Sequence, residues 1–222
     1  MNSNPFDIDL AITKIREAVR PYPPAAMFQL ADEGYNTPFQ QLIACIISIR
    51  TYDEVSIPVA KTLFAQAKTA VAISQLTLEQ ITHLIQQSTY AERKASQIKT
   101  IAQKVIEEFG GELPCDKETF LSFAGVGPKC AHLALGIACG QPYISVDVHV
   151  HRITNRWGYV QAKTPEKTMA ALEKKLPQAY WIEINHLLVP FGKHICQGRV
   201  PRCKSCPLFS MCKRVDVRSY RS

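Results

Sequence analysis

The sequence lacks the features that direct a chain to a membrane or to a repetitive architecture. It has no uninterrupted apolar run of about 18 residues, which a membrane-spanning helix needs. It has no charged start followed by an apolar core, which a secretory signal needs. No segment recurs at an interval of roughly 20–50 residues, and none is of low complexity. We therefore expect an intracellular globular protein that does not enter a membrane.

Alternation of apolar and polar residues, the pattern of a half-buried strand, is almost absent. Helical spacing dominates instead, and Thr37-Pro38, Thr77 with Gln80, and Thr164-Pro165 resemble helix starts. The sequence therefore predicts an all-α protein of roughly nine or ten helices with short connections. The expected helices are one near the N-terminus and others at about 37–49, 53–68, 77–87, 91–109, 116–123, 128–138, 148–157, 165–175 and 179–191.

Acidic residues are scarce near the C-terminus. Residues 193–222 contain eight Lys and Arg, among them Arg202 and Lys204, and one acidic residue, Asp216. The rest of the chain has 18 of each sign, so this segment carries the whole net charge of +7. Such a patch indicates a polyanionic partner, of which nucleic acid is the commonest. A solvated tail that aids solubility is the alternative.

Four of the eight cysteines stand close together in this basic segment. Cys196, Cys203, Cys206 and Cys212 have the spacing C-x6-C-x2-C-x5-C. Soft thiolates at this spacing can enclose a tetrahedral zinc ion or an iron–sulfur cluster, and the residues alone leave both open. Disulfide pairing is a third interpretation, which a reducing cytosol disfavours.

A glycine-rich turn is expected between the helices at 116–123 and 128–138. Gly125 and Gly127 flank Val126, and Pro128 sets the first turn of the second helix. Backbone N–H groups exposed at a helix N-terminus can bind an anion such as a phosphate. A simple helix–helix turn is the alternative.

Two residues beside helix starts have reactive side chains. Lys129 directly follows Pro128, where the positive end of the helix disfavours the ammonium form and favours a nucleophilic amine. Asp147 precedes the helix at 148–157 and is first of all an N-cap. His149 and His151 diverge on that helix, so packing or a DNA contact is expected rather than a metal site. The alternative for Lys129 is an ordinary surface lysine.

The cysteine spacing, the turn and the segment Val146–Arg152 (VDVHVHR) together resemble the endonuclease III family of helix-hairpin-helix DNA glycosylases and AP lyases. The resemblance extends from about Phe39 to Cys212. It implies that all four cysteines bind a [4Fe-4S] cluster, which favours iron–sulfur over zinc. It also implies that Lys129 forms a Schiff base with the sugar and then cleaves the strand by β-elimination, while Asp147 assists.

The resemblance also implies an organisation and a biological role. Two helical lobes are expected: one at 29–141, which contains the hairpin, and another made of 1–28 and 142–222, whose residues 196–212 form the cluster loop. The partner would be double-stranded DNA that contains damaged bases, in particular oxidised pyrimidines, or abasic sites. We expect a monomer in the cytoplasm, associated with the nucleoid.

Three positions depart from the family pattern. Ala124 replaces the proline of the usual LPGVG hairpin, and Arg50 stands where a glutamine would fill the space left by the flipped base. Tyr90 stands in the loop that usually carries the wedge residue, where it could stack into the duplex or be a core tyrosine. The DNA-binding residues expected are Gly125, Val126, Gly127, Arg50, Tyr90, His149, Arg202 and Lys204. The alternatives are a monofunctional or mismatch-specific glycosylase, or a non-catalytic iron–sulfur protein that binds DNA or senses redox state.

Overall fold

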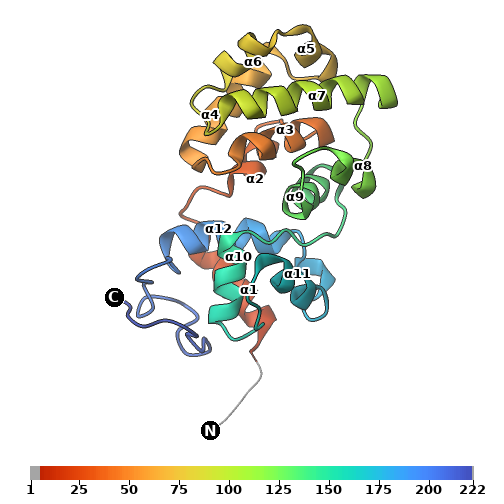
Figure 1. Cartoon of the computed structure of the whole chain (residues 1–222). Coiled ribbons are helices and arrows are strands. Elements are labelled where there is room, and N and C mark those ends of the chain that lie inside the picture. Colours follow the sequence, from red (N-terminus) through yellow and green to blue (C-terminus); the bar gives the residue numbers. More distant parts are fainter. Residues whose placement is uncertain (1–5, 222) are drawn as a thin grey trace. The chain divides into compact units, whose positions relative to one another are not determined.

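The structure is a computed structural model that describes residues 6–221. This part of the chain forms twelve α-helices and one 3-10 helix and contains no strand, which confirms the all-α prediction (Figure 1). It divides into two compact units: Ala26–Tyr143, and the residues up to Ala25 together with Ile144 onward. The contiguous unit begins before residue 29 and ends beyond residue 141. None of the described helices is long and apolar enough to span a membrane.

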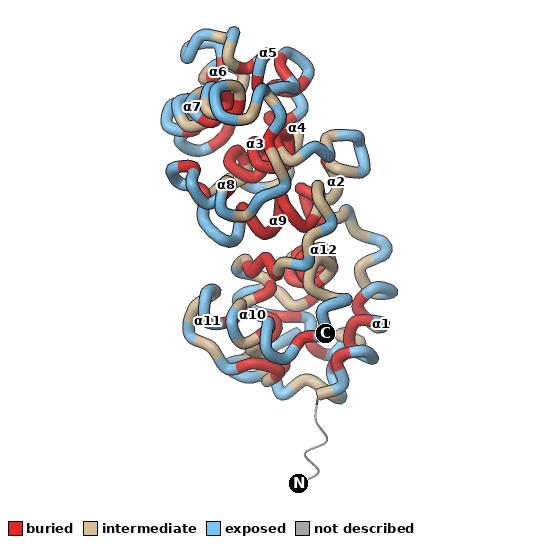
Figure 2. Tube along the Cα trace, turned by 90° about the vertical axis from the view of Figure 1, so that its right-hand side faces the viewer, coloured by how far each residue is buried: buried red, intermediate tan, exposed pale blue. Residues whose placement is uncertain are grey.

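The contiguous unit is built around α3 (Pro38–Ser48). Every residue of this helix from Phe39 to Ile47 is buried (Figure 2). It packs against α4 (Asp53–Gln66), α7 (Ala91–Phe109) and α9 (Pro128–Cys139). The remaining helices of the unit are α2 (Ala26–Asp32), α5 (Ala70–Gln75), α6 (Leu78–Leu84) and α8 (Lys117–Ser122). An all-round apolar helix of this kind belongs in the centre of a domain. A capping box between Thr37 and Gln40 fixes its start.

The second unit combines the N-terminal helix with the C-terminal third of the chain. It contains α1 (Ile8–Val19), α10 (Val148–Arg156), α11 (Pro165–Glu173), the 3-10 helix η1 (Gln178–Tyr180) and α12 (Glu183–His194). α12 packs on α1 and α10, and Phe191 and Trp157 are among the largest side chains of its core. Arg16 of α1 forms a bidentate ion pair with Glu183, with both N–O distances 2.7 Å. From Ile195 to Arg221 the chain has no regular helix.

The sequence prediction omitted two helices of the structure and gave the wrong bounds for one other. α2 and α5 were not predicted, because seven and six residues are too few to show a helical period. The helix expected at 179–191 is η1 followed by α12, which begins at Glu183 and ends at His194. The two missed helices raise the count above the nine or ten expected.

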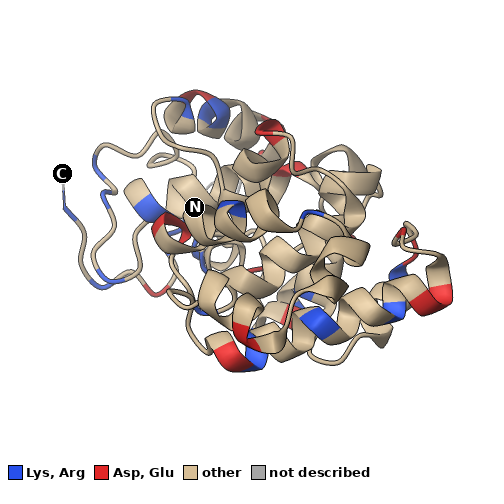
Figure 3. Cartoon of the chain, turned by 90° about the horizontal axis from the view of Figure 1, so that it is seen from above, with Lys and Arg blue, Asp and Glu red and all other residues tan. Residues whose placement is uncertain are grey.

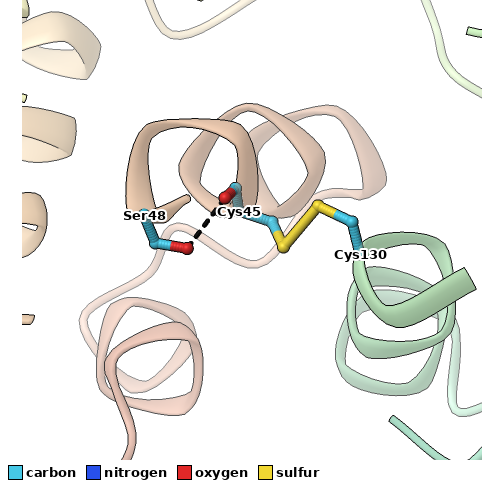
Figure 4. Close-up of a disulfide and its surroundings, with 3 residues drawn as sticks. All are labelled: Cys45, Ser48 and Cys130. Atoms are coloured by element: carbon cyan, nitrogen blue, oxygen red, sulfur yellow. Dashed lines mark hydrogen bonds between the residues drawn. A yellow bond between two sulfur atoms is a disulfide. The ribbon is translucent and has the colours of Figure 1, made fainter. Parts of the chain in front are cut away.

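The four cysteines outside the C-terminal loop form two disulfides. Cys45 of α3 is bonded to Cys130 of α9, as Figure 4 shows, and Cys115 is bonded to Cys139 at the end of α9. The Cα atoms of each pair are 6.0 Å apart. Both bonds hold α9, one at its first turn and the other at its last. The sequence indicates neither bond, because separations of 85 and 24 residues leave no local pattern.

Candidate nucleic-acid interface and cysteine loop

The turn between α8 and α9 is a tight hairpin anchored in the core. Phe123 and Val126 are buried, and the N–H of Val126 donates to the carbonyl of Phe123 at 3.0 Å. Gly125 has a φ of +80°, which favours glycine. A Cβ at this position would also lie 2.9 Å from the amide nitrogen of Gln97. That side chain donates to the carbonyl of Ala124 at 2.7 Å and so ties the hairpin to α7.

The hairpin exposes the backbone of its two glycines to solvent, whereas the Val126 side chain is buried. Val126 was expected to bind DNA, but its side chain belongs to the core and its N–H is used within the turn. In the described chain, no backbone hydrogen bond has the N–H of Gly125 or Gly127 as its donor. Gly127 is the N-cap of α9, and Lys129 is exposed at the second helical position. The arrangement places exposed backbone at a helix N-terminus, which can hold an anion.

Arg50 and Tyr90 lie side by side, although 40 residues separate them. The guanidinium carbon of Arg50 is 5.9 Å from the centroid of the Tyr90 ring, and its Nη1 donates to the tyrosine hydroxyl at 3.4 Å. Both residues are exposed, Tyr90 to 62%. The interpretation of Tyr90 as a core residue is therefore wrong. An exposed aromatic ring beside an arginine is suited to base stacking.

Asp147 is the N-cap of α10, as its position in the sequence predicts. Its Oδ1 accepts hydrogen bonds from the N–H groups of His149 and Val150, both at 2.9 Å. The two N–H groups at the start of the helix hold the carboxylate in a fixed orientation. One face of the half-buried carboxylate is thus engaged by the backbone of α10.

The two histidines of α10 have different partners. His149 Nδ1 lies 3.1 Å from Nη2 of Arg152, which also donates to the carbonyls of Gly192 and Cys196. A Cβ at Gly192 would lie too close to Nδ1 of His149 and to Nη2 of Arg152, so these side chains pack directly against the glycine of α12. His151 Nδ1 is 2.7 Å from Oγ1 of Thr168. The two imidazole rings therefore contact different side chains, Arg152 for His149 and Thr168 for His151.

The four C-terminal cysteines line one small cavity together with arginine and apolar side chains. All four are free thiols, Cys203 is buried, and the other three are half-buried. Burial raises the pKa of Cys206 to about 12 and also raises the pKa of Cys203 and Cys212. Among the described residues, no three His, Cys, Asp or Glu side chains form a group that could hold a metal ion.

Nitrogen donors approach two of the sulfur atoms in this cavity, although burial raises the pKa of Cys212. Nη1 of Arg156 donates to Sγ of Cys196 at 3.6 Å, and the N–H of Arg214 donates to Sγ of Cys212 at 3.4 Å. Cationic and N–H donors stabilise thiolates, which soft metals require. The four cysteines are not grouped as ligands of a single metal ion, but four thiols that line one cavity are the type and number of ligands that an iron–sulfur cluster uses.

The basic segment surrounds the cysteine loop, and Lys and Arg recur along it in Figure 3. Arg202 and Lys204 are exposed on either side of buried Cys203. Their backbones are fixed, because the N–H of Arg202 donates to the Ile195 carbonyl at 2.9 Å and that of Lys204 to the Arg221 carbonyl at 3.4 Å. The two charged side chains therefore extend from a backbone that these hydrogen bonds hold in place.

Sequence reasoning missed the residues that hold these groups in place. Gln97 supports the hairpin, and Lys94 of α7 donates to the turn that contains Arg50. Both stand on a helix with ordinary amphipathic spacing, where a polar residue normally faces solvent. Lys94 differs from such a solvent-facing residue because it is buried, and the sequence gives no sign of that burial.

Comparisons with known proteins agree with the fold and show the family. A family model described as HhH-GPD superfamily base excision DNA repair protein matches residues 43–178. Endonuclease III of Thermotoga maritima is 38% identical over 79% of this chain and 83% of its own length. Endonuclease III of Bacillus subtilis is 33% identical over 83% and 84%.

Solved structures of endonuclease III bound to DNA are also similar. A non-covalent complex matches with a TM-score of 0.82 and 27% identity, and covers 93% of this chain and 94% of that one. A trapped covalent intermediate with an estranged adenine matches with a TM-score of 0.80 and 26% identity, and covers 94% and 96%.

Proposed function

Since this chain belongs to the endonuclease III family of the HhH-GPD superfamily, it is a DNA glycosylase and AP lyase of base excision repair, and we propose that it excises oxidised pyrimidines through a Schiff base on Lys129. The observation that supports this role is the position of Lys129 at the start of α9, directly after the hairpin. The protein acts on double-stranded DNA that carries damaged bases or abasic sites. We propose that it does so as a monomer, in the cytoplasm with the nucleoid.

The proposed chemistry begins with DNA held through its phosphates. The N–H groups of Gly125 and Gly127 bind a backbone phosphate and position the damaged nucleotide, which leaves the base stack. The neutral amine of Lys129 attacks C1′, the glycosidic bond breaks, and the base departs with its electron pair and takes up a proton. Loss of the amine proton and ring opening give the imine.

The imine then allows strand cleavage. It acidifies the proton at C2′, whose removal expels the 3′-phosphate and breaks the C3′–O bond, which is β-elimination. Water hydrolyses the remaining imine and restores the amine of Lys129. The strand is nicked, and no oxidant or reductant is consumed.

Asp147 has a proposed electrostatic role. A carboxylate oriented by two N–H donors stabilises the positive charge that develops on the sugar as the glycosidic bond breaks. It also favours the approach of the amine, because it can accept a proton during the attack. Capping and catalysis are compatible, because the cap fixes the carboxylate in place.

The remaining contacts recognise the duplex. Arg50 and Tyr90 occupy the space that the extruded nucleotide leaves, Arg202 and Lys204 bind phosphates, and His149 lies at the DNA-facing end of α10. We further propose that Cys196, Cys203, Cys206 and Cys212 hold a [4Fe-4S] cluster. When bound, the cluster would cross-link the loop and keep its basic residues in a fixed arrangement, and no step of the reaction passes through it.

Borohydride trapping tests the proposal. Purified protein is incubated with a duplex that has one thymine glycol, and reduction should convert the imine into a permanent protein–DNA adduct. The Lys129→Gln variant should give neither adduct nor strand cleavage, yet it should still bind an uncleavable abasic analogue. Lys117→Gln, which changes a half-buried lysine at the start of α8, is the matched control and should trap normally. Trapping by Lys129→Gln would overturn the assignment of the nucleophile.

A further inference from the structure

The disulfide between Cys115 and Cys139 joins the two ends of the helix-hairpin-helix. Cys115 directly precedes Asp116, the N-cap of α8, and Cys139 is the last residue of α9. The 24-residue separation between the two cysteines therefore spans α8, the glycine turn and the whole of α9. The turn lies at one end of this motif and the disulfide at the other. The helix-hairpin-helix is thus a covalently closed loop.

Solvent reaches this disulfide but not the other one. Cys115 is exposed and Cys139 is half-buried. Cys45 and Cys130, the pair in Figure 4, are only 0% and 4% exposed. Thiol–disulfide exchange begins when a thiolate approaches a sulfur atom, so its rate depends on access. A reductant in solution can therefore attack the Cys115–Cys139 bond in the folded protein, whereas the buried bond must first be uncovered by local unfolding.

The other contacts at this end of the motif are exposed to water. Nε2 of Gln141, which follows α9, donates to the carbonyl of Cys115 at 2.7 Å, and Oδ2 of Asp116 accepts from the N–H of Thr119 at 2.7 Å. Such hydrogen bonds contribute little net stability, because water competes for both groups. Breaking the disulfide therefore leaves the start of α8 freer to move relative to the end of α9.

The motif should nevertheless stay folded when the disulfide is broken. Phe120 of α8 and Phe123, which follows it, are buried in the core of the contiguous unit. α8 also packs on α9, and Gln97 of α7 still holds the turn through the carbonyl of Ala124 (Figure 1). Reduction should thus change the freedom of the motif rather than remove its structure.

This freedom affects how the turn binds a phosphate. Backbone N–H groups bind an anion well when their directions are already fixed, and a flexible segment loses conformational entropy on binding. The closed loop has lost part of that entropy before DNA binds. The disulfide form should therefore bind DNA more tightly than the dithiol form.

We propose that Cys115 and Cys139 are a thiol–disulfide exchange site that controls DNA affinity: the disulfide keeps the helix-hairpin-helix arranged for binding, and reduction to two thiols loosens it. The inference rests on the proposed function, because it assumes that the turn binds a DNA phosphate. It adds a regulation of that same site. An oxidant that damages bases also closes this bond, so DNA binding strengthens under the conditions in which the damage arises.

The exchange is balanced with a dithiol as reductant and a peroxide as oxidant. A thiolate of the dithiol attacks one sulfur, the other cysteine leaves as a thiolate and takes up a proton, and the second thiol of the reductant then displaces the first cysteine and closes a cyclic disulfide. Two electrons and two protons pass to the protein. In the reverse direction, hydrogen peroxide converts one thiol to a sulfenic acid and releases water, and the second thiol displaces another water as the disulfide forms.

The affinities of the two redox states give the first test. The full chain is equilibrated with reduced and oxidised dithiothreitol in varied ratio, and fluorescence anisotropy measures its binding to a duplex with a tetrahydrofuran abasic analogue. Affinity should fall at least about fivefold on reduction, which is the lower end of typical coupling between two sites. Circular dichroism should show unchanged helix content. Alkylation with peptide mass analysis should find Cys115 and Cys139 modified, and Cys45 and Cys130 unmodified.

Thermodynamic linkage gives the second test. If the disulfide strengthens DNA binding by some factor, DNA must make the disulfide harder to reduce by the same factor. Saturating duplex should therefore lower the reduction potential of this pair, by about 20 mV for a fivefold effect. A disulfide with a structural role alone would have the same potential with and without DNA.

Two double variants separate the exposed bond from the buried one. Cys115→Ser with Cys139→Ser should bind DNA as weakly as the reduced wild type and should not respond to dithiothreitol. Cys45→Ala with Cys130→Ala is the matched control, because it removes the buried bond and keeps the exposed one. Its affinity should still fall on reduction. If the serine variant does not fold, the comparison of the two wild-type states decides, because it needs no substitution.

The outcomes separate this inference from the proposed function. If excision and trapping are normal and the folded protein binds DNA equally in both redox states, the inference alone fails. If affinity depends on the redox state but the protein neither excises nor traps, the proposed function alone fails. Absence of duplex binding in both states would overturn both. Cys115 and Cys139 that remain thiols after treatment with hydrogen peroxide would also overturn the inference.

Discussion

The guanidinium of Arg156 donates to the Sγ of Cys196 at 3.6 Å and, through the same nitrogen, to the carbonyl of Gln197 at 2.6 Å. A residue in the last turn of α10 thus holds the first cysteine of the loop. The contact supplies a positive charge where a cluster-bound thiolate would need one. The helix that begins at Asp147 therefore ends at the cysteine loop, and the state of the loop can be expected to affect α10.

Iron and acid-labile sulfide should accompany the purified protein, which should be brown. Cys203→Ala removes a buried ligand, so it should lose the colour and lower the thermal midpoint, because metal binding and folding are coupled. Elemental and sulfide analysis provides the measurement. Cys115→Ala, a cysteine outside the loop, should keep the cluster. Stoichiometric zinc without sulfide would contradict the assignment.

Binding to DNA should weaken steeply with salt. Replacing Arg202 and Lys204 with Ala should each reduce the slope of log affinity against log salt by up to about one unit, with little change in lesion preference. Lys174→Ala, an exposed lysine at the end of α11, should leave the slope unchanged. Fluorescence anisotropy across a salt series measures this. A slope unaffected by either loop substitution would identify these residues as a solvated surface.

Asp147→Asn keeps an oxygen that can accept the two N–H groups of α10 but loses the charge. The variant should fold and bind DNA, yet turn over about 10²–10⁴-fold more slowly, as expected for loss of a catalytic carboxylate. Single-turnover kinetics gives the rate. Asp116→Asn is the control, because Asp116 caps α8 by accepting from Thr119 at 2.7 Å. Normal turnover by Asp147→Asn would leave this residue with a structural role alone.

Lys94 should impose a pH dependence on stability. Burial lowers its pKa from 10.5 to about 8 in the folded protein. Between these two values the unfolded chain binds more protons than the folded chain, so the folded state gains stability as pH rises through this window. The thermal midpoint of the wild type should therefore rise relative to that of Lys94→Met between pH 8 and 10.5. A pH-independent difference would show that the ammonium is not desolvated.

The two disulfides should protect their cysteines from alkylation. Intact-mass measurement of unfolded, unreduced protein should find Cys45, Cys115, Cys130 and Cys139 unmodified, and prior reduction should expose all four. Reduction should also lower the thermal midpoint, because closing loops of this length stabilises a fold by about 3–5 kcal/mol in the chain-entropy model. Full alkylation without reductant would contradict the pairing.

Local signals made the fold class and several helix starts predictable. The capping boxes at Thr37 and Thr77 and the prolines at 38, 128 and 165 act within one turn of chain, so they are visible in the sequence. The short helices α2 and α5 were missed because their existence depends on neighbours, chiefly α9 for α2 and α7 for α5. Local pattern cannot report such contacts.

The candidate site likewise contains some features that the sequence predicts and others that it does not. Cysteine spacing, the glycine hairpin and the aspartate cap are short-range patterns, and the structure shows the hairpin, the cap and the shared cavity of the four cysteines. Lys94 could not have been found, because its acceptors lie more than 40 residues away in sequence. Val126 was expected to bind DNA as part of the hairpin, and no local pattern indicates that its side chain is buried.

The discontinuous unit has a consequence for synthesis. Arg16 and its partner Glu183 are separated by 167 residues, and α1 packs on α12. Domains fold as units during translation. The unit Ala26–Tyr143 of a nascent chain can therefore fold before α12, on which the first helix packs, has been synthesised. The apolar face of α1 must therefore remain uncovered until the last third of the chain has left the ribosome. Loss of residues near the C-terminus would leave the N-terminal helix without its packing partner. The unit that contains the hairpin could still fold.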